Sequence, residues 1–287
     1  MTPVPFGTRL AAAMAAHGPL CVGIDPHASL LDAWGLRDDV EGLRRFSLTV
    51  MEAVAGRVAA VKPQAAFFER HGSRGLAVLE EVVAAGRESG TLVVVDAKRG
   101  DIGSTMAAYA EAFLREGSPL AGDALTVSPF LGFGSLTPAV DLALASGRGL
   151  FVLCLTSNPE GSQVQHARTL GDDGAAGPSG AAVVAAHAAR INAGATPLGS
   201  IGLVVGATIG DAAARTGTDL VAVNGPLLAP GVGAQGAGAA ELRSVFGDAR
   251  ERVLASSSRG VLRAGPDVAA LRAAALEASR EAGLALR

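Results

Sequence analysis

The chain has 287 residues, of which 49% are hydrophobic and 18% are charged, and its formal net charge is −3. This composition excludes an intrinsically disordered chain, and the length suits either one large α/β domain or two smaller ones. The slight acidity and the lack of a basic block argue against a nucleic-acid partner.

The N-terminal segment is predicted to form an amphipathic helix, because Phe6, Leu10 and Met14 recur at a spacing of four. It lacks a basic start followed by a continuous apolar stretch, so we expect no secretory signal. No window approaches ~18 strongly apolar residues, so we expect no membrane partner. The two cysteines, Cys21 and Cys154, each lie in an apolar run, which favours buried thiols over a disulfide bridge. The natural compartment of such a chain is the reducing cytoplasm.

Short apolar runs that end in polar residues, glycine or proline recur along the whole chain. They comprise residues 20–25, 58–62, 91–98, 124–128, 149–156, 201–207, 227–231 and 253–257. Most are rich in Val, Ile or Leu without period-two alternation, as expected for parallel strands that are buried on both faces. Residues 220–223 could form a further strand.

Helix-compatible segments separate these runs, as at residues 38–58, 72–90 and 106–116. Eight strands that alternate with helices predict a single α/β domain over residues 1–287, a (β/α)8 TIM barrel. An open, doubly wound sheet is the structural alternative. Residues 161–180, after the fifth strand, are polar, glycine-rich and aperiodic. We predict that they form a partly mobile surface loop on the rim of the active site.

Ionisable residues stand where the predicted strands end. The first strand ends at Asp25, the second at Lys62, and the third carries Asp96, Lys98 and then Asp101. Because side chains alternate along a strand, Asp96 and Lys98 should face the same side, at the mouth where barrels do chemistry. Opposite charges desolvated there must be paired, and pairing favours a protonated lysine that can act as a general acid. A solvated cluster of charges on a loop is the alternative.

The seventh predicted strand runs into a glycine-rich segment. Gly231 and Gly233 would let backbone N–H groups approach an anion closely. Gln235 and Arg259 could complete a phosphate site, which barrels often place after strands seven and eight. Taken alone, the glycine run is more often a plain loop, and Arg259 at the next strand end is what favours phosphate. It is not a P-loop, because no Gly-Lys-Ser/Thr follows.

At the third strand the sequence resembles a known family. Residues 93–105 (VVVDAKRGDIGST) closely resemble the signature of the orotidine 5'-phosphate decarboxylase family. Further pieces follow in family order over nearly the whole chain: GIDP at 23–26, VKPQAAFFE at 61–69, LTSNPEG at 155–161, APGVGAQG at 229–236 and SSSRG at 256–260. The VKPQAAFFE and TSNP forms resemble the longer bacterial type (type 2). Gly134 stands where an acidic residue is expected.

The resemblance implies cofactor-independent decarboxylation of orotidine 5'-phosphate to uridine 5'-phosphate, in pyrimidine biosynthesis. In it, Lys98 would donate the proton to C6, and Asp96 would face the substrate carboxylate. Lys62 would hold Asp96 and touch the ribose, whose hydroxyls Asp25 would bind. Ser157 would hydrogen-bond the pyrimidine edge.

The resemblance also implies a homodimer with shared active sites, because Asp101, Ile102 and Thr105 would reach into the partner's site. The phosphate ligands that it implies are Pro230, Gly231, Gly233, Gln235 and Arg259.

Two other functions stay open. A related barrel that acts on sugar phosphates would share Asp-x-Lys-x-x-Asp, but those relatives look metal-dependent, with a glutamate where this chain has Lys62. A lysine repels a divalent ion, and the five histidines show no His-x-x-x-His spacing, so we expect no metal and no cofactor. The second alternative is a non-catalytic nucleotide-binding protein, which the intact Lys98 with its flanking aspartates disfavours.

Overall fold

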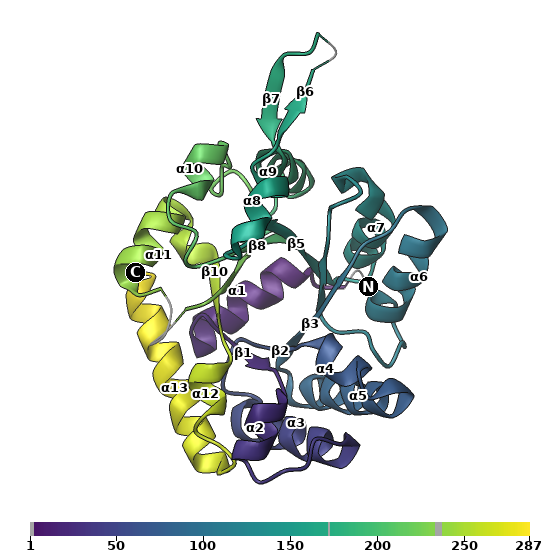
Figure 1. The fold of residues 1–287 in the computed structure, drawn as a ribbon, viewed down its shortest axis with the longest axis vertical. Helices are drawn as coiled ribbons and strands as arrows, with labels where there is room; N and C mark the ends of the chain where they lie inside the picture. Colours follow the sequence, from purple (N-terminus) through teal and green to yellow (C-terminus); the bar gives the residue numbers. More distant parts are fainter. Residues whose placement is uncertain (1–2, 172, 233–236) are drawn as a thin grey trace.

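Parallel strands close into a barrel at the centre of the structure (Figure 1). The computed structural model describes residues 3–171, 173–232 and 237–287. Around the barrel the strands follow the order β1-β10-β9-β8-β5-β4-β3-β2. Their bounds are β1 (Leu20–Ile24), β2 (Ala60–Pro63), β3 (Leu92–Arg99), β4 (Ala124–Val127), β5 (Gly149–Leu155), β8 (Ile201–Val205), β9 (Leu227–Pro230) and β10 (Val253–Ser257). The predicted (β/α)8 barrel is therefore confirmed, and the open sheet is excluded.

The eight apolar runs predicted as strands all form barrel strands, with ends that differ by a few residues. The additional candidate, residues 220–223, forms a turn instead. Asp219 Oδ1 accepts hydrogen bonds from the backbone N–H groups of Val221 at 3.0 Å and Ala222 at 2.9 Å. A side chain that binds its own backbone in this way competes with strand pairing.

A ring of helices covers the outside of the barrel (Figure 1). The three predicted helices are α3 (Val40–Val54), α5 (Gly72–Ser89) and α6 (Gly103–Leu114). The other α-helices of the ring are α2 (Ala28–Ala33), α4 (Ala65–Glu69), α7 (Thr137–Ala145), α9 (Gly180–Ile191), α10 (Ala212–Thr216), α11 (Ala239–Phe246), α12 (Arg259–Leu262) and α13 (Val268–Ala285). The 3₁₀ helices η1 (Phe133–Leu136) and η3 (Gly247–Arg252) precede α7 and β10. Among the described residues, no helix is both long and apolar enough to cross a membrane.

The predicted N-terminal helix is α1 (Phe6–His17), which lies across one end of the barrel (Figure 1). Phe6 and Leu10 are fully buried in a cluster with barrel side chains such as Phe151. The Phe6 and Phe151 rings meet edge to face with centroids 5.9 Å apart. A Cβ at residue 149 would lie 2.1 Å from the Phe6 ring, so Gly149 is what admits this ring to the start of β5. The helix thus plugs the amino-terminal end of the barrel.

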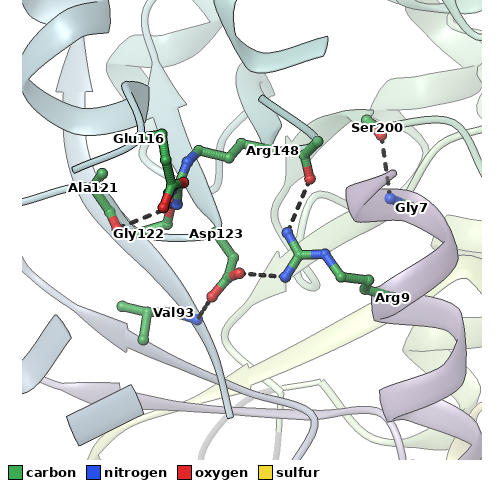
Figure 2. Close-up of polar contacts among 10 residues, drawn as sticks. Gly7, Arg9, Val93, Glu116, Ala121, Gly122, Asp123, Arg148 and Ser200 are labelled. Carbon is green, nitrogen blue, oxygen red and sulfur yellow. Dashed lines mark hydrogen bonds and ion pairs between the residues drawn. The ribbon is translucent and has the colours of Figure 1, made fainter. Parts of the chain in front are cut away.

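An ion pair and a hydrogen bond of Arg9 hold this plug in place (Figure 2). The guanidinium of Arg9 donates to Asp123 and to the Gly147 carbonyl oxygen. The other oxygen of Asp123 accepts from Val93 N at 2.9 Å, so one carboxylate links α1 to β3. Nearby, the buried Arg148 donates to the Gly122 and Ala121 carbonyl oxygens and to Glu116.

The segment 161–180 was predicted to be an aperiodic loop, and this is wrong in part. It contains α8 (Ser162–Gln165) and an antiparallel hairpin of β6 (Arg168–Leu170) and β7 (Ala176–Ser179), after the 3₁₀ helix η2 (Pro159–Gly161). The hairpin projects from the barrel (Figure 1, top). Most of its side chains are exposed, so it carries no buried face whose period could reveal it in the sequence. Its predicted mobility stays a prediction.

Candidate active site

A cavity of about 1240 Å³ opens at the carboxyl-terminal end of the barrel. Its walls include side chains from the ends of β2, β3, β9 and β10 and from the loops after β1 and β5. Most of the residues that the sequence singled out line it: Asp25, Lys62, Asp96, Lys98, Ser157, Pro230, Gly231 and Arg259. The barrel therefore brings together residues that lie as far apart in the chain as 25 and 259.

Asp96 stands at the centre of the charged group. Lys62 Nζ donates to Asp96 Oδ2 at 2.8 Å, and Lys98 Nζ donates to Oδ1 at 2.6 Å. Thr126 Oγ1 also donates to Oδ1, at 2.8 Å. One carboxylate therefore holds two lysine side chains that come from neighbouring strands.

The two lysines differ in how deeply they are buried. Lys62 and Asp96 are only 5% and 6% exposed, whereas the side chain of Lys98 is 44% exposed and reaches into the cavity. A charge pair as buried as Lys62 and Asp96 persists only when it is closely paired and hydrogen-bonded. Lys62 therefore anchors the carboxylate, and Lys98 is the ammonium that can meet a ligand.

The charges of the group stabilise one another. Desolvation by burial raises the pKa of Asp96, but Lys62 and Lys98, through their charges and hydrogen bonds, outweigh it and lower that pKa to about 2. Desolvation likewise lowers the pKa of Lys62, but the charges of Asp96 and Asp25 prevail and raise it above its ordinary value. At neutral pH Asp96 is therefore a carboxylate and Lys62 an ammonium.

The backbone of β3 is irregular where it delivers Lys98. The pairing register between β3 and β4 shifts between Val95 and Arg99. Lys98 has a φ of +48°, in the left-handed region that non-glycine residues seldom adopt, and its N–H donates to Thr126 Oγ1 at 3.0 Å. Strain of this kind costs on the order of 1–3 kcal/mol and is typical of functional sites. Asp96 and Lys98 do face the same site, as predicted, but through a bulge rather than through regular alternation.

Sequence reasoning missed Thr126 and Gln64. Gln64 lies two residues after Lys62 and lines the same cavity. With its amide nitrogen toward Asp96 and its oxygen toward Lys98, it donates to Asp96 Oδ2 at 2.5 Å and accepts from Lys98 Nζ at 3.2 Å. Its spacing of two from Lys62, one residue beyond the end of β2, is the signal that could have identified it.

Asp25 offers an unused acceptor at the cavity wall. Its Oδ1 is buried and, within the described residues, has no hydrogen-bond partner. A buried carboxylate oxygen without a donor is costly, and a ligand hydroxyl would satisfy it. This fits the predicted contact with a sugar hydroxyl.

Several residues of the predicted phosphate site also line the cavity. Gly231, at a φ of +90°, follows β9, and Arg259 is the first residue of α12 after β10. Arg263, which the sequence reading missed, lines the cavity one turn further along. The two guanidiniums can bind an anion that backbone N–H groups approach. The predicted ligands Gly233 and Gln235 lie outside the described residues.

Asp101, Ile102 and Thr105 are not among the residues that line this cavity. They stand around the start of α6, where Asp101 Oδ1 accepts from Ile102 N and the Ile102 side chain is 62% exposed. Ser157 lies at the rim, beyond the end of β5. His27 also lines the cavity, where its ring packs on Phe67 with centroids 4.3 Å apart.

A second cavity, of about 460 Å³, lies at the opposite end of the barrel beside Arg9 and Arg148. These arginines are engaged with Asp123, Glu116 and backbone carbonyl oxygens (Figure 2). Arg9 of this second cavity thus fixes α1, and Arg148 binds the segment before β4. Both guanidiniums are engaged in contacts within the chain.

Comparisons with known proteins agree on one family. The model of the "Orotidine 5'-phosphate decarboxylase / HUMPS family" matches residues 18–274. The chain is 65% identical over 271 residues to the orotidine 5'-phosphate decarboxylase of Streptomyces coelicolor and 64% identical over 270 residues to that of Salinispora arenicola. Each alignment covers 94% of this chain and 94% of the relative.

Solved structures give the same result. A Streptomyces avermitilis protein named for this activity is 63% identical, with a TM-score of 0.93 over 100% of this chain and 97% of that one. The orotidine monophosphate decarboxylase of Leishmania donovani is 31% identical, with a TM-score of 0.72 over 99% of both chains.

Proposed function

Because the chain belongs to the orotidine 5'-phosphate decarboxylase family and is a carboxy-lyase, we propose that it converts orotidine 5'-phosphate to uridine 5'-phosphate without a cofactor. The observation that carries this proposal is the position of Lys98 Nζ, 2.6 Å from Asp96 Oδ1 and exposed to the cavity. The match to the family over residues 18–274 also supports one barrel domain over the whole chain.

In the proposed reaction, the bond between C6 and the carboxylate breaks and carbon dioxide leaves. The electron pair stays on C6, and Lys98 donates a proton to it. The ammonium is fixed by Asp96 and Gln64 before the substrate binds, so it stabilises the developing negative charge without reorganising. Enzymes lower barriers by ~8–23 kcal/mol, and only interactions stronger in the transition state than in the ground state contribute.

Asp96 would lie beside the substrate carboxylate and destabilise it by repulsion. Because Lys62 and Lys98 hold the pKa of Asp96 at about 2, this carboxylate stays ionised in the site. Lys62 would hold Asp96 and contact the ribose, and Asp25 Oδ1 would accept a hydrogen bond from a ribose hydroxyl.

The remaining roles concern the ends of the substrate. Ser157 would bind the pyrimidine edge. Pro230, Gly231 and Arg259 would form the phosphate site together with Gly233 and Gln235, which lie outside the described residues. Binding energy from the phosphate would help to order the site.

We also propose a homodimer with shared sites, in the cytoplasm. Ile102 and Thr105 are exposed, and neither they nor Asp101 line this subunit's own cavity, which supports a contact with a partner. Phe130 is 73% exposed and Leu131 53% exposed in the loop after β4. Apolar side chains so exposed are typical of a surface that another chain covers.

An ultraviolet assay that follows the loss of orotidine 5'-phosphate tests the proposed activity. Turnover that persists in EDTA supports this function over the metal-dependent sugar-phosphate barrel, because Lys62 repels a divalent ion where those relatives look to have a glutamate. Binding of the nucleotide without turnover would instead identify a non-catalytic binding protein, and the proposal would fail.

A further inference from the structure

One side chain of the segment 161–180, which we call the insert, contacts the rim of the active site. Gln165, the last residue of α8, is half-buried and binds Thr156 with both ends of its amide. Thr156 N donates to Gln165 Oε1 at 2.9 Å, and Gln165 Nε2 donates to Thr156 Oγ1 at 2.7 Å. Two hydrogen bonds between one amide and one residue fix both the position and the orientation of that residue.

Thr156 in turn holds the residues that face the cavity. It follows the end of β5 and precedes Ser157, and its Oγ1 donates to Asn158 Oδ1 at 2.6 Å. Ser157 and Asn158 both line the cavity. The path from Gln165 to the site therefore passes through a single residue.

A second contact confines Ser157 from the other side. A Cβ at residue 206 would lie 3.1 Å from Ser157 N and 3.3 Å from Ser157 Cβ, so the backbone of Gly206 packs closely against it. Ser157 therefore lies between Gly206, which follows β8, and Thr156, which Gln165 holds by two hydrogen bonds. Neither contact involves the Ser157 hydroxyl, and no other described residue hydrogen-bonds to it, so a ligand could bind there.

We propose that Gln165 is a positioning residue, through which the insert places the Ser157 hydroxyl against the pyrimidine edge of the substrate. This inference rests on the proposed function. Residues 161–180 would then contribute to recognition of the base, rather than form only a surface projection. A displacement of about 1 Å at a group that orients the substrate can cost on the order of 100-fold in rate.

The test is a double-mutant cycle on orotidine 5'-phosphate. Gln165→Met keeps the size of the side chain and removes both hydrogen bonds, and we expect kcat/KM to fall by about tenfold. In a Ser157→Ala background the same change should cost less than about twofold, because the hydroxyl that Gln165 positions is gone. Gln163→Met is the matched control, since Gln163 lies exposed on the same short helix, and it should leave kcat/KM unchanged.

The outcomes separate this inference from the proposed function. If the wild-type chain does not decarboxylate the substrate, both fail. If the wild type is active and Gln165→Met costs nothing, costs the same in both backgrounds, or is matched by Gln163→Met, then only the inference is overturned. Thermal unfolding of each variant checks that the barrel remains folded.

Discussion

Thr126 Oγ1 donates a hydrogen bond of 2.8 Å to Asp96 Oδ1, the same oxygen that Lys98 Nζ binds. The hydroxyl also accepts the backbone N–H of Lys98 at 3.0 Å. A fully buried threonine on β4 thus supports both the carboxylate that holds the ammonium and the left-handed backbone that carries it.

Removal of this hydroxyl should impair turnover more than binding. Thr126→Val keeps the shape of the side chain but leaves Asp96 and the Lys98 N–H each short of a partner, a loss of roughly 1–3 kcal/mol per group. We expect kcat to fall about tenfold to 100-fold with little change in KM. Steady-state kinetics check this, and Thr126→Ser, which retains the hydroxyl, should stay close to the wild type. A valine variant with the wild-type kcat would contradict the role.

The ion pairs of Asp96 make stability depend on acid pH. Its pKa is lowered from 3.8 to about 2 in the folded chain, so the stabilisation is complete above about pH 4 and is lost as the pH falls toward 2. That shift corresponds to about 2 kcal/mol. Denaturant unfolding of the wild type and Asp96→Asn should therefore give free energies whose difference changes by this amount between about pH 5 and pH 2. If the free energies of unfolding of the two proteins change in parallel with pH, the pKa of Asp96 is the same in the folded and the unfolded chain.

The plug at the amino end should matter for stability and not for chemistry. Phe6 is fully buried against Phe151, so Phe6→Ala should lower the free energy of unfolding by about 3–5 kcal/mol. Because α1 closes the end opposite the catalytic cavity, kcat of the folded variant should be unchanged. Val4→Ala is the control, since Val4 is 56% exposed. An equal loss of stability in Phe6→Ala and Val4→Ala would show that burial of Phe6 does not hold α1 against the barrel.

The phosphate site predicts a substrate-dependent effect. If Arg259 binds the phosphate, Arg259→Ala should lower kcat/KM for orotidine 5'-phosphate by on the order of 100-fold. The same change should leave the slow reaction of orotidine, which lacks the phosphate, almost unaffected. An equal loss of kcat/KM for the two substrates would show that Arg259 does not act through the phosphate.

Much of the fold could be predicted from the sequence because burial on both faces leaves a continuous apolar run at each barrel strand. The spacing of two correctly predicted that Asp96 and Lys98 face the same site, although an irregular β3 backbone rather than regular alternation brings them there. Neither the bulge nor Thr126 could be predicted, because the register of β3 depends on its neighbour β4, and a lone threonine in an apolar run fits a core position equally well.

Other features around the site could not be predicted from any local pattern in the sequence. The hairpin at β6 and β7 is exposed, so no periodic pattern indicates it. Gln165 contacts Thr156 only because α8 folds back on the end of β5, a geometry that depends on the whole 157–165 turn. Asp25 Oδ1, which has no hydrogen-bond partner among the residues that the structure describes, could not be predicted either, because its burial depends on the packing around the cavity.

In the proposed mechanism, the Lys98 ammonium protonates the electron pair left on C6. Lys98→Ala, assayed by ultraviolet absorbance with orotidine 5'-phosphate, tests this most directly, with circular dichroism to confirm the fold. We expect turnover to fall by on the order of 10³-fold or more. A folded variant that keeps activity within about tenfold of the wild type would contradict it.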